Sequence, residues 1–261
     1  MFFYFGYGSN INLVSLKAKG VIPLSSERAI LHGWKLRFNV RHWFRHEGGV
    51  ANIVPSSDPA DFVEGMVHAC PDDSLASLDA VESYGVGYDR TEVEVVTAGR
   101  KIKAQTYTGL PGFIDDSCLP TRRYLNIIIK GAEAAGLSLS YIEKLRHLPV
   151  FPEKDYPEFK PPPGNWPHFN NNSLASHSAY TALGGHVFDM HQAREDLQGI
   201  IGLLGGKDVT LFFVKRHDTS DGNETIEDVI NGKISPAAGK YVNAYLNEFA
   251  REYIYTGRFD Y

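Results

Sequence analysis

A glycine-containing loop close to the N-terminus offers several backbone N–H groups to an anion. The loop reads Tyr7-Gly8-Ser9-Asn10 and follows an aromatic, β-prone segment, residues 2–7. Such a loop between a strand and a helix N-terminus forms a nest for a carboxylate, or for the oxyanion made when a nucleophile attacks a carbonyl. The other interpretation is a plain strand-to-helix turn in which Ser9 or Asn10 caps the helix. The four residues alone leave both interpretations open.

A carboxylate at the end of a short helix is the second chemical candidate. Apolar residues at three-residue spacing predict a helix over residues 73–82, and Glu82 closes it directly before the glycine-punctuated, tyrosine-flanked loop 83–88. A carboxylate there faces the negative end of the helix dipole, where it takes up a proton readily, as a general base does. The alternatives are a solvated glutamate at a helix end, and Asp79, one turn earlier, in the same role.

Strands are the main elements expected to position these groups. Tyr88 and Tyr107 lie on the two sides of a predicted hairpin, where they either line a pocket with hydroxyl donors or simply pack. The front half is therefore expected to be a compact antiparallel sheet or a small barrel. The predicted strands are residues 2–7, 34–40, 49–54, 63–70, 92–97 and 101–108, and the predicted helices are residues 73–82, 121–135 and a stretch that ends at Arg146.

The composition changes after residue 148. Prolines and asparagines gather up to Asn172, so we assign residues 149–182 to a linker between a first domain, residues 1–148, and a C-terminal extension, residues 183–261. The extension is expected to be too small to bury a core alone and to dock on the first domain as a lid, a dimer arm or added packing surface. In it we expect a helix over 187–204, a strand over 209–214 and an amphipathic helix over 238–253.

The order of these motifs resembles the γ-glutamylcyclotransferase superfamily, and residues 1 to about 148 carry the resemblance. Five segments are similar to motifs of that family: Tyr4 to Asn10 to its opening YFxYGSN signature, Glu47 to Ile53 to its GG-A-I strand, Val63 to Val67 to its V-x-G-V strand, Leu78 to Glu82 to its LDxxE segment, and Pro120 to Leu137 to its PSxxYxxxIxxGAxxxGL helix.

The resemblance implies an α+β fold, a small and mostly antiparallel β-barrel wrapped by helices, with the C-terminal α/β extension added to it. It also implies an enzyme that acts on a γ-glutamyl amide without a cofactor. The α-amine of the γ-glutamyl group attacks its own γ-carbonyl, which closes 5-oxoproline and expels the amine. Because this cyclisation is intramolecular, the protein needs only to orient two ends of one substrate and to move a proton.

The family's residue roles transfer to matching positions of this chain. Glu82 takes the α-ammonium proton and passes it to the leaving nitrogen. In the loop that begins at Tyr7, the N–H groups of Gly8, Ser9 and Asn10 hold the carboxylate or the oxyanion of the substrate. By the same resemblance, Tyr88 and Tyr107 correspond to tyrosines that line the pocket, with Tyr88 offset by about one position.

One departure concerns the leaving group. The family has Gly directly after the catalytic Glu, whereas Ser83-Tyr84 follow Glu82 here. The leaving group therefore stays open between an amino acid and an amine or another isopeptide. A function of a different class, a non-catalytic protein that binds a small molecule or a partner on the same fold, also stays open.

The composition of the chain argues against several other classes of protein. The chain has 261 residues, of which 43% are hydrophobic and 22% charged, with a net charge of −5, so no global basic field exists to collect nucleic acid. No run approaches the about 18 apolar residues of a membrane span, and the start lacks the cationic region of a signal peptide. Two cysteines, Cys70 and Cys118, are too few for a disulfide scaffold. We therefore expect a cytoplasmic protein.

Metal and phosphate sites are not expected either. The pairs His42 with His46, and His186 with His191, do not make a closed metal site. Residues 202–208 suggest a phosphate-binding loop, but they lack its first glycine and carry Asp208 where the magnesium-binding Ser or Thr belongs. The resemblance implies a small γ-glutamyl molecule as the substrate, with no cofactor, and a homodimer is one role open to the extension.

Overall fold

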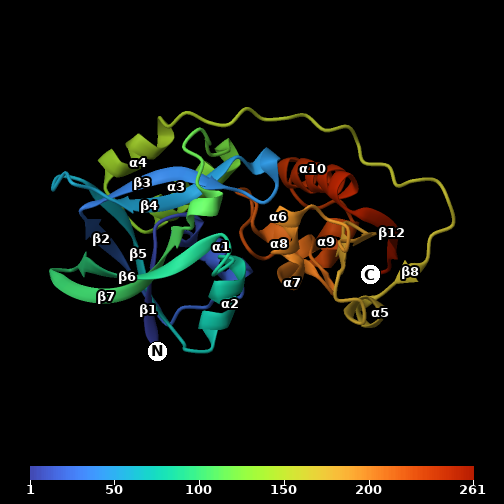
Figure 1. The fold of residues 1–261 in the computed structure, drawn as a ribbon, viewed down its shortest axis with the longest axis horizontal. Helices are drawn as coiled ribbons and strands as arrows, with labels where there is room; N and C mark the ends of the chain where they lie inside the picture. Colours follow the sequence, from blue (N-terminus) through green and yellow to red (C-terminus); the bar gives the residue numbers. More distant parts are fainter. The chain divides into compact units, whose positions relative to one another are not determined.

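The protein, described by a computed structural model over residues 1–261, divides into two compact units, Met1–Glu153 and Lys154–Tyr261 (Figure 1). The first unit contains every residue that the sequence singled out for chemistry. Each unit has its own sheet and its own buried side chains.

The first unit is built on a closed five-stranded barrel. Its pairings are antiparallel except that between the first and last strands of the order, where Tyr4 of β1 pairs in parallel with Gln105 of β7. This barrel confirms the predicted fold class. The strand order is β1 (Phe2–Gly6), β5 (Phe62–Cys70), β2 (Ser25–His32), β6 (Tyr88–Thr97) and β7 (Arg100–Gly109), and β3 (Trp34–Arg41) pairs with β4 (Gly49–Pro55) in a separate ribbon.

Strand β5 lies at the centre of this arrangement. Eight of its nine residues are buried, as expected for a strand covered on both faces. Where β5 passes β1, a Cβ on Gly65 would lie 2.4 Å from the Gly6 carbonyl oxygen, so only glycine permits this approach. Strand β2 was not predicted, because polar residues fill its first half and only Ala29 and Leu31 show the buried alternation.

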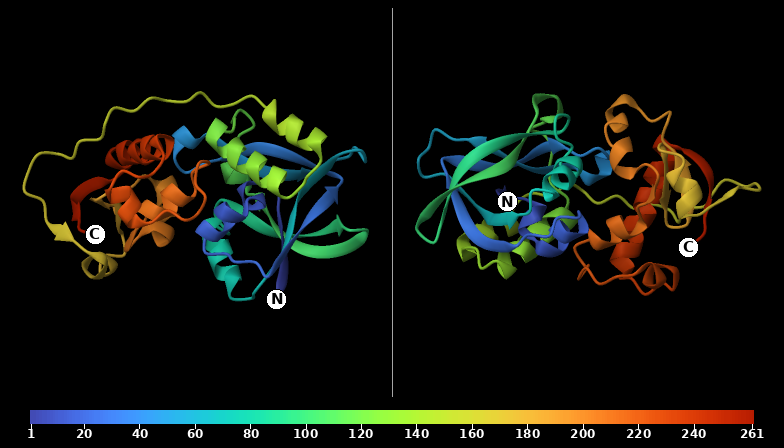
Figure 2. Two further views of the ribbon diagram at one scale, coloured as in Figure 1. Left: turned by 180° about the vertical axis from the view of Figure 1, so that it is seen from behind. Right: turned by 90° about the horizontal axis from the view of Figure 1, so that it is seen from below.

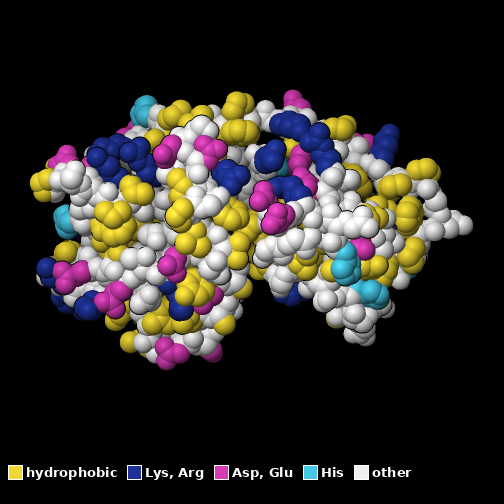
Figure 3. Space-filling model, viewed as in Figure 1, with side chains coloured by type: hydrophobic (Ala, Val, Ile, Leu, Met, Phe, Trp, Pro, Cys, Tyr) yellow, Lys and Arg dark blue, Asp and Glu magenta, His cyan; other side chains and the backbone are white.

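The β6–β7 hairpin turns at Ala98 and Gly99, both with positive φ, as a two-residue hairpin turn requires. On its exposed face Lys101 pairs with Glu94 at 2.7 Å and Lys103 with Glu92 at 2.8 Å. Basic and acidic side chains are accordingly interspersed over this part of the surface (Figure 3).

Helices close the barrel and carry the site. Helices α3 and α4 cover one side of it, while α1 and α2 lie together at one end (Figure 2). Thr121 caps α3 by accepting the N–H of Tyr124, and Gly136, with φ 66°, ends it. The elements are η1 (Ser9–Ile11), α1 (Leu13–Ala18), η2 (Arg45–Glu47), α2 (Ser74–Val81), η3 (Pro111–Phe113), α3 (Arg122–Ala134) and α4 (Leu139–Arg146).

The second unit has a five-stranded sheet with helices. Ring contacts join the sheet to the long helix α10 (Pro236–Glu252), with Phe188 and Phe249 at 5.6 Å between centroids. The strand order is β11 (Lys207–Asp208), β9 (Tyr180–Leu183), β10 (His186–Asp189), β12 (Ile254–Phe259) and β8 (His168–Phe169), and the shorter helices are α5 (Asn171–Ala175), α6 (Glu195–Gln198), α7 (Ile201–Leu204), α8 (Thr210–Lys215) and α9 (Ile226–Ile230).

Several expectations for this unit were wrong. The segment 149–182 contains β8, α5 and most of β9, because Asn170 caps a helix in a capping box instead of continuing a linker. The predicted helix 187–204 starts as strand β10, since Gly184 and Gly185, both at positive φ, make a tight hairpin before it. Contrary to our expectation, the unit also buries a core of its own.

The predicted strand 209–214 is helix α8. Its β-branched and aromatic residues favour a strand locally, but Phe213 packs its ring 4.1 Å from that of Tyr245 on α10, and Asp208 accepts the N–H and the hydroxyl of Thr210 at the start of the helix. Tertiary packing overrides strand propensity here. The amphipathic helix expected over 238–253 is confirmed as α10. No helix anywhere in the protein has both the length and the apolar character needed to cross a membrane.

Candidate active site

The loop after β1 is held by the cap of the helix that follows. Asn12, not Ser9 or Asn10, is the N-cap of α1, since its Oδ1 accepts the N–H of Val14 at 2.9 Å. The turn before it is the short 3₁₀ segment η1, which begins after Gly8. A Cβ on Gly8 would lie 2.9 Å from the Cβ of Ala51, so a side chain cannot be added there without movement.

Glu82 lies at the C-terminal end of α2, as predicted. Its backbone N–H donates to the Leu78 carbonyl at 3.0 Å, and Leu78 itself is fully buried against Tyr4, Leu16 and Tyr107. The Glu82 side chain is only 15% exposed. Helix α2 is thus anchored by Leu78, and the anchor directs Glu82 toward the glycine loop.

Asn10 joins the loop to Glu82. Its Nδ2 donates to Glu82 Oε1 at 2.8 Å and to the Tyr4 hydroxyl at 2.6 Å. Asn10 and Lys19 both approach the same oxygen of this carboxylate, Oε1. The structure therefore brings together the two motifs that the sequence placed 72 positions apart.

Lys19 is a functional candidate that the sequence did not reveal. Its ammonium donates to Asn10 Oδ1 at 2.5 Å and to Ser9 Oγ at 3.0 Å, and lies 3.8 Å from Glu82 Oε1. The side chain is 5% exposed. In the sequence Lys19 looks like an ordinary lysine at a helix end, and no spacing rule marks it. Tyr4, in the strand before the loop, was also not predicted as a site residue, because no spacing rule marks its contact with Asn10.

The two acidic residues of α2 have different surroundings. Asp79 accepts the hydroxyl of Tyr107 at 2.6 Å and lies 3.5 Å from Arg90 Nε. It has no contact with the glycine loop. Of the two candidates for the general base, the structure brings Glu82, and not Asp79, to the glycine loop.

The predicted pocket tyrosines donate to protein acceptors. Tyr7 donates to the Tyr107 carbonyl at 2.5 Å, Tyr88 to the Ala51 carbonyl at 2.7 Å, and Tyr107 to Asp79. Burial, with the charge of Glu82 adding to it, holds the pKa of Tyr7 well above its ordinary value, and burial does the same to the pKa of Tyr88 and Tyr107. All three side chains are therefore neutral phenols, and in this structure their hydroxyl groups are hydrogen-bonded within the protein.

The loop after Glu82 keeps a backbone shape that suits glycine. Ser83, which stands where the related family has Gly, has φ 52°, and Gly85 has φ 80°. Positive φ is the region that glycine adopts at little cost. The Tyr84 ring is 43% exposed and lies under the guanidinium of Arg90, 4.5 Å from its centroid. The departure in sequence thus leaves a glycine-like bend and adds an aromatic side chain beside it.

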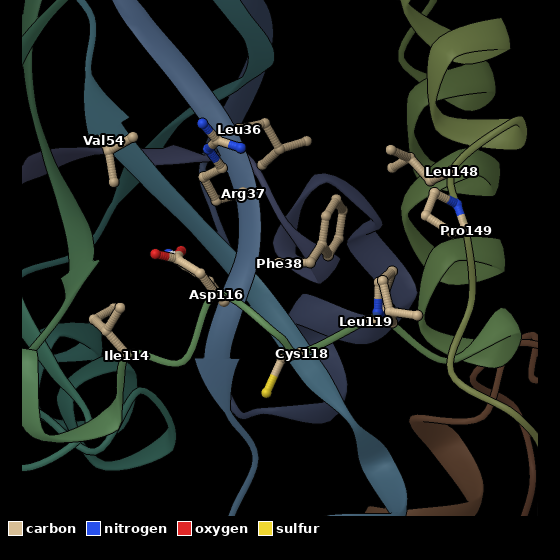
Figure 4. Close-up of a pocket in the computed structure, with 12 residues that line it drawn as sticks. Leu36, Arg37, Phe38, Val54, Ile114, Asp116, Cys118, Leu119, Leu148 and Pro149 are labelled. Atoms are coloured by element: carbon tan, nitrogen blue, oxygen red, sulfur yellow. Dashed lines mark hydrogen bonds between the residues drawn. The ribbon is translucent and has the colours of Figure 1, made fainter.

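A cavity of about 700 Å³ lies elsewhere in the first unit (Figure 4). It opens between β3, the end of β4 and the loop around Asp116 and Cys118. Neither Glu82 nor any residue of the loop 7–10 lines it. Burial raises the pKa of the Cys118 thiol, so this cysteine has no feature of an activated nucleophile.

A buried histidine of β5 holds the Asn10 backbone. His68 Nε2 donates to the Asn10 carbonyl at 3.0 Å, and its Nδ1 accepts the Ser26 hydroxyl at 2.7 Å. This pair of bonds fits the neutral imidazole, which has one donor and one acceptor. Burial lowers the pKa of His68 from 6.5 to about 4. The glycine loop therefore rests on an uncharged ring.

This burial predicts a loss of stability in mild acid. The unfolded chain binds a proton at His68 below pH 6.5, whereas the folded protein does so only near pH 4, so stability falls as the pH decreases through this interval, by up to about 3 kcal/mol. Urea unfolding at pH 7 and pH 5 measures about 2 kcal/mol of this change, because pH 5 still lies above the folded pKa of about 4. In His68→Gln, which cannot titrate, the dependence is expected to be weaker by that amount, and equal slopes for the two proteins would disprove this role.

Comparisons with known proteins find a matching family model and relatives with similar sequences. A family model described as the AIG2-like family matches residues 62–145. The "Gamma-glutamylcyclotransferase" of Homo sapiens is 33% identical over 152 residues, which cover 56% of this chain and 78% of the relative, and that of Bos taurus is 32% identical with the same coverage.

Solved structures agree with this likeness. A crystal structure of an uncharacterized human protein superposes with a TM-score of 0.52 at 30% identity, covering 59% of this chain and 92% of that one. A structure named "Gamma-glutamyl cyclotransferase" gives a TM-score of 0.50 at 30% identity, with 59% and 90% covered.

Proposed function

Because the chain belongs to the γ-glutamylcyclotransferase-like superfamily, we propose that its first unit cyclises the γ-glutamyl group of an amino acid or amine conjugate to 5-oxoproline. The amine leaves as the second product. The observation that supports this proposal most is the hydrogen bond from Asn10 Nδ2 to Glu82 Oε1, which sets a carboxylate beside the glycine loop.

Glu82 is the proposed proton carrier. Its Oε2, the oxygen that does not accept the Asn10 bond, takes a proton from the α-ammonium of the substrate, and the amine so released attacks the γ-carbonyl carbon. When the bond from this carbon to the leaving nitrogen breaks, the same carboxyl gives that proton to the leaving nitrogen. The regenerated carboxylate then takes the second proton from the ring nitrogen, which becomes the lactam N–H, and passes it to the released amine. One residue thus serves as base and then as acid, which general acid–base catalysis permits.

The glycine loop is the proposed anion site. Gly8 and the first residues of η1 present N–H groups at the N-terminus of a turn, where a carboxylate or the developing oxyanion is stabilised. Glycine is needed at position 8 for the packing of the loop itself, because a Cβ there would lie 2.9 Å from the Ala51 Cβ and 3.1 Å from the Tyr124 hydroxyl. Orientation then supplies the remainder of the rate enhancement, since both reacting ends belong to one molecule.

The reaction class can be tested with a matched pair of substrates. Release of 5-oxoproline is measured over a panel of γ-glutamyl amino acids and γ-glutamylamines. We expect turnover of at least one substrate, and none when the α-amine of that substrate is acetylated, because the blocked nitrogen cannot attack. Cleavage of the acetylated substrate would indicate hydrolysis instead of cyclisation.

The same panel tests the second class of function. Binding of γ-glutamyl compounds without turnover of any of them would favour a non-catalytic protein on this fold. The ranking of the panel would also show whether the leaving group is an amino acid or an amine, which the bend at Ser83 and Tyr84 leaves open.

A further inference from the structure

Lys19 is a buried cation within the candidate active site. It is the C-cap residue of α1, and its ammonium reaches back to Ser9 and Asn10 at the start of the loop. Burying an ammonium is costly unless hydrogen bonds and an opposite charge compensate for it. Here Ser9 Oγ, Asn10 Oδ1 and the Glu82 carboxylate provide that compensation.

The lysine determines which way the Asn10 carboxamide faces. An ammonium can only donate, so the Asn10 atom that meets it must be the oxygen. The Nδ2 group then points to the opposite side, where it donates to Glu82 and Tyr4. Without Lys19 the carboxamide could rotate by half a turn and present its oxygen to the Glu82 oxygen, which would repel it.

The lysine also offsets the charge of Glu82 on one side only. Both Lys19 and Asn10 approach Oε1 of the carboxylate, at 3.8 Å and 2.8 Å. The other oxygen is thereby kept for the substrate. A carboxylate that is held at one oxygen and open at the other has a defined direction for proton transfer.

We propose that Lys19 is a positioning residue of the cyclisation: by fixing the Asn10 carboxamide and the Oε1 atom of Glu82, it aims Oε2 at the ammonium of the substrate. This inference rests on the proposed function. It assigns to Lys19 no contact with the reacting atoms.

The test compares Lys19→Met with Lys17→Met. Methionine keeps the length of the side chain but removes the charge, and Lys17, in the same helix, is exposed. For Lys19→Met we expect kcat to fall about 100-fold, the loss that a misplacement of about 1 Å causes, with KM within threefold of wild type. Lys17→Met should match the wild type in both constants. Circular dichroism confirms that each variant is folded.

A second measurement separates positioning from general support of the fold. Urea unfolding midpoints are compared for Lys19→Met, Glu82→Gln and the double variant. If the two residues act on each other, the midpoint shift of the double variant is smaller than the sum of the single shifts.

The outcomes are distinct. A kcat of Lys19→Met within threefold of wild type, a loss confined to KM, or additive midpoint shifts would each overturn the inference. If the wild-type protein forms no 5-oxoproline, the proposed function fails, and the midpoints alone then decide whether Lys19 holds Glu82: additive shifts reject this role, and non-additive shifts retain it.

Discussion

Replacing Glu82 by Gln is expected to lower the rate of 5-oxoproline formation by about 10³-fold, within the range that one acid–base group supplies. Glutamine has the same shape and can still accept the hydrogen bond of Asn10 through its side-chain oxygen, so the loop should stay in place. It cannot take up the ammonium proton at neutral pH. The loss is therefore expected in kcat more than in KM, because the γ-glutamyl group still finds the N–H groups of the loop.

Asp79→Asn is the matched control for this experiment. It removes the other carboxylate of α2, which is occupied by Tyr107 and Arg90, and we expect it to keep at least about a tenth of the activity, since the loss of one hydrogen-bonded partner costs about 1–1.5 kcal/mol. Both rates are measured on the best substrate of the panel. A Glu82→Gln protein that retains a tenth or more of the wild-type rate would remove Glu82 from the mechanism.

The second large effect is expected at a glycine of α3 that packs against the backbone of Asn12. A Cβ on Gly131 of α3 would lie 2.5 Å from the backbone nitrogen of Asn12 and 2.7 Å from its Cα. Neither atom can move without displacing the cap of α1. Forced overpacking costs about 1–3 kcal/mol, whereas alanine gains at most about 1 kcal/mol over glycine in a helix, so the clash outweighs the gain.

We therefore expect Gly131→Ala to lower the free energy of unfolding by up to about 2 kcal/mol, as the difference between these two terms. The unfolding midpoint in urea measures the change. Gly239→Ala is the control, because this glycine lies in α10 and a Cβ on it meets nothing within 4 Å. That substitution should stabilise the protein by up to about 1 kcal/mol. Equal midpoint shifts in both variants would refute the packing argument.

The barrel could be predicted because its strands carry local signals. The turn at Ala98 and Gly99 predicted the β6–β7 hairpin of the barrel, and the alternation in residues 34–40 predicted β3 of the separate ribbon, as the structure confirms. Strand β2 was missed because its exposed, polar half hides the alternation. In the second unit, short elements such as α8 are decided by ring packing between distant residues, which no local pattern shows.

The residues of the candidate site likewise divide into those that local sequence patterns predict and those that they do not. Glu82 could be placed at the end of its helix because three-residue spacing marks α2, and the glycine loop is visible as a string of turn residues. The partners of these groups could not be found. Lys19 and His68 meet Asn10 only after the strand and the helix have folded together, and neither residue has a spacing that indicates such a contact.

The parallel pairing of β1 with β7 has a consequence for the order of folding. The first strand of the chain can complete the barrel only after residues up to about 105 are available, since Tyr4 pairs with Gln105. Contacts of such long sequence separation form late and slow the search for the native state. The glycine loop, which directly follows β1, therefore acquires its shape near the end of folding, although it precedes most of the barrel in the sequence.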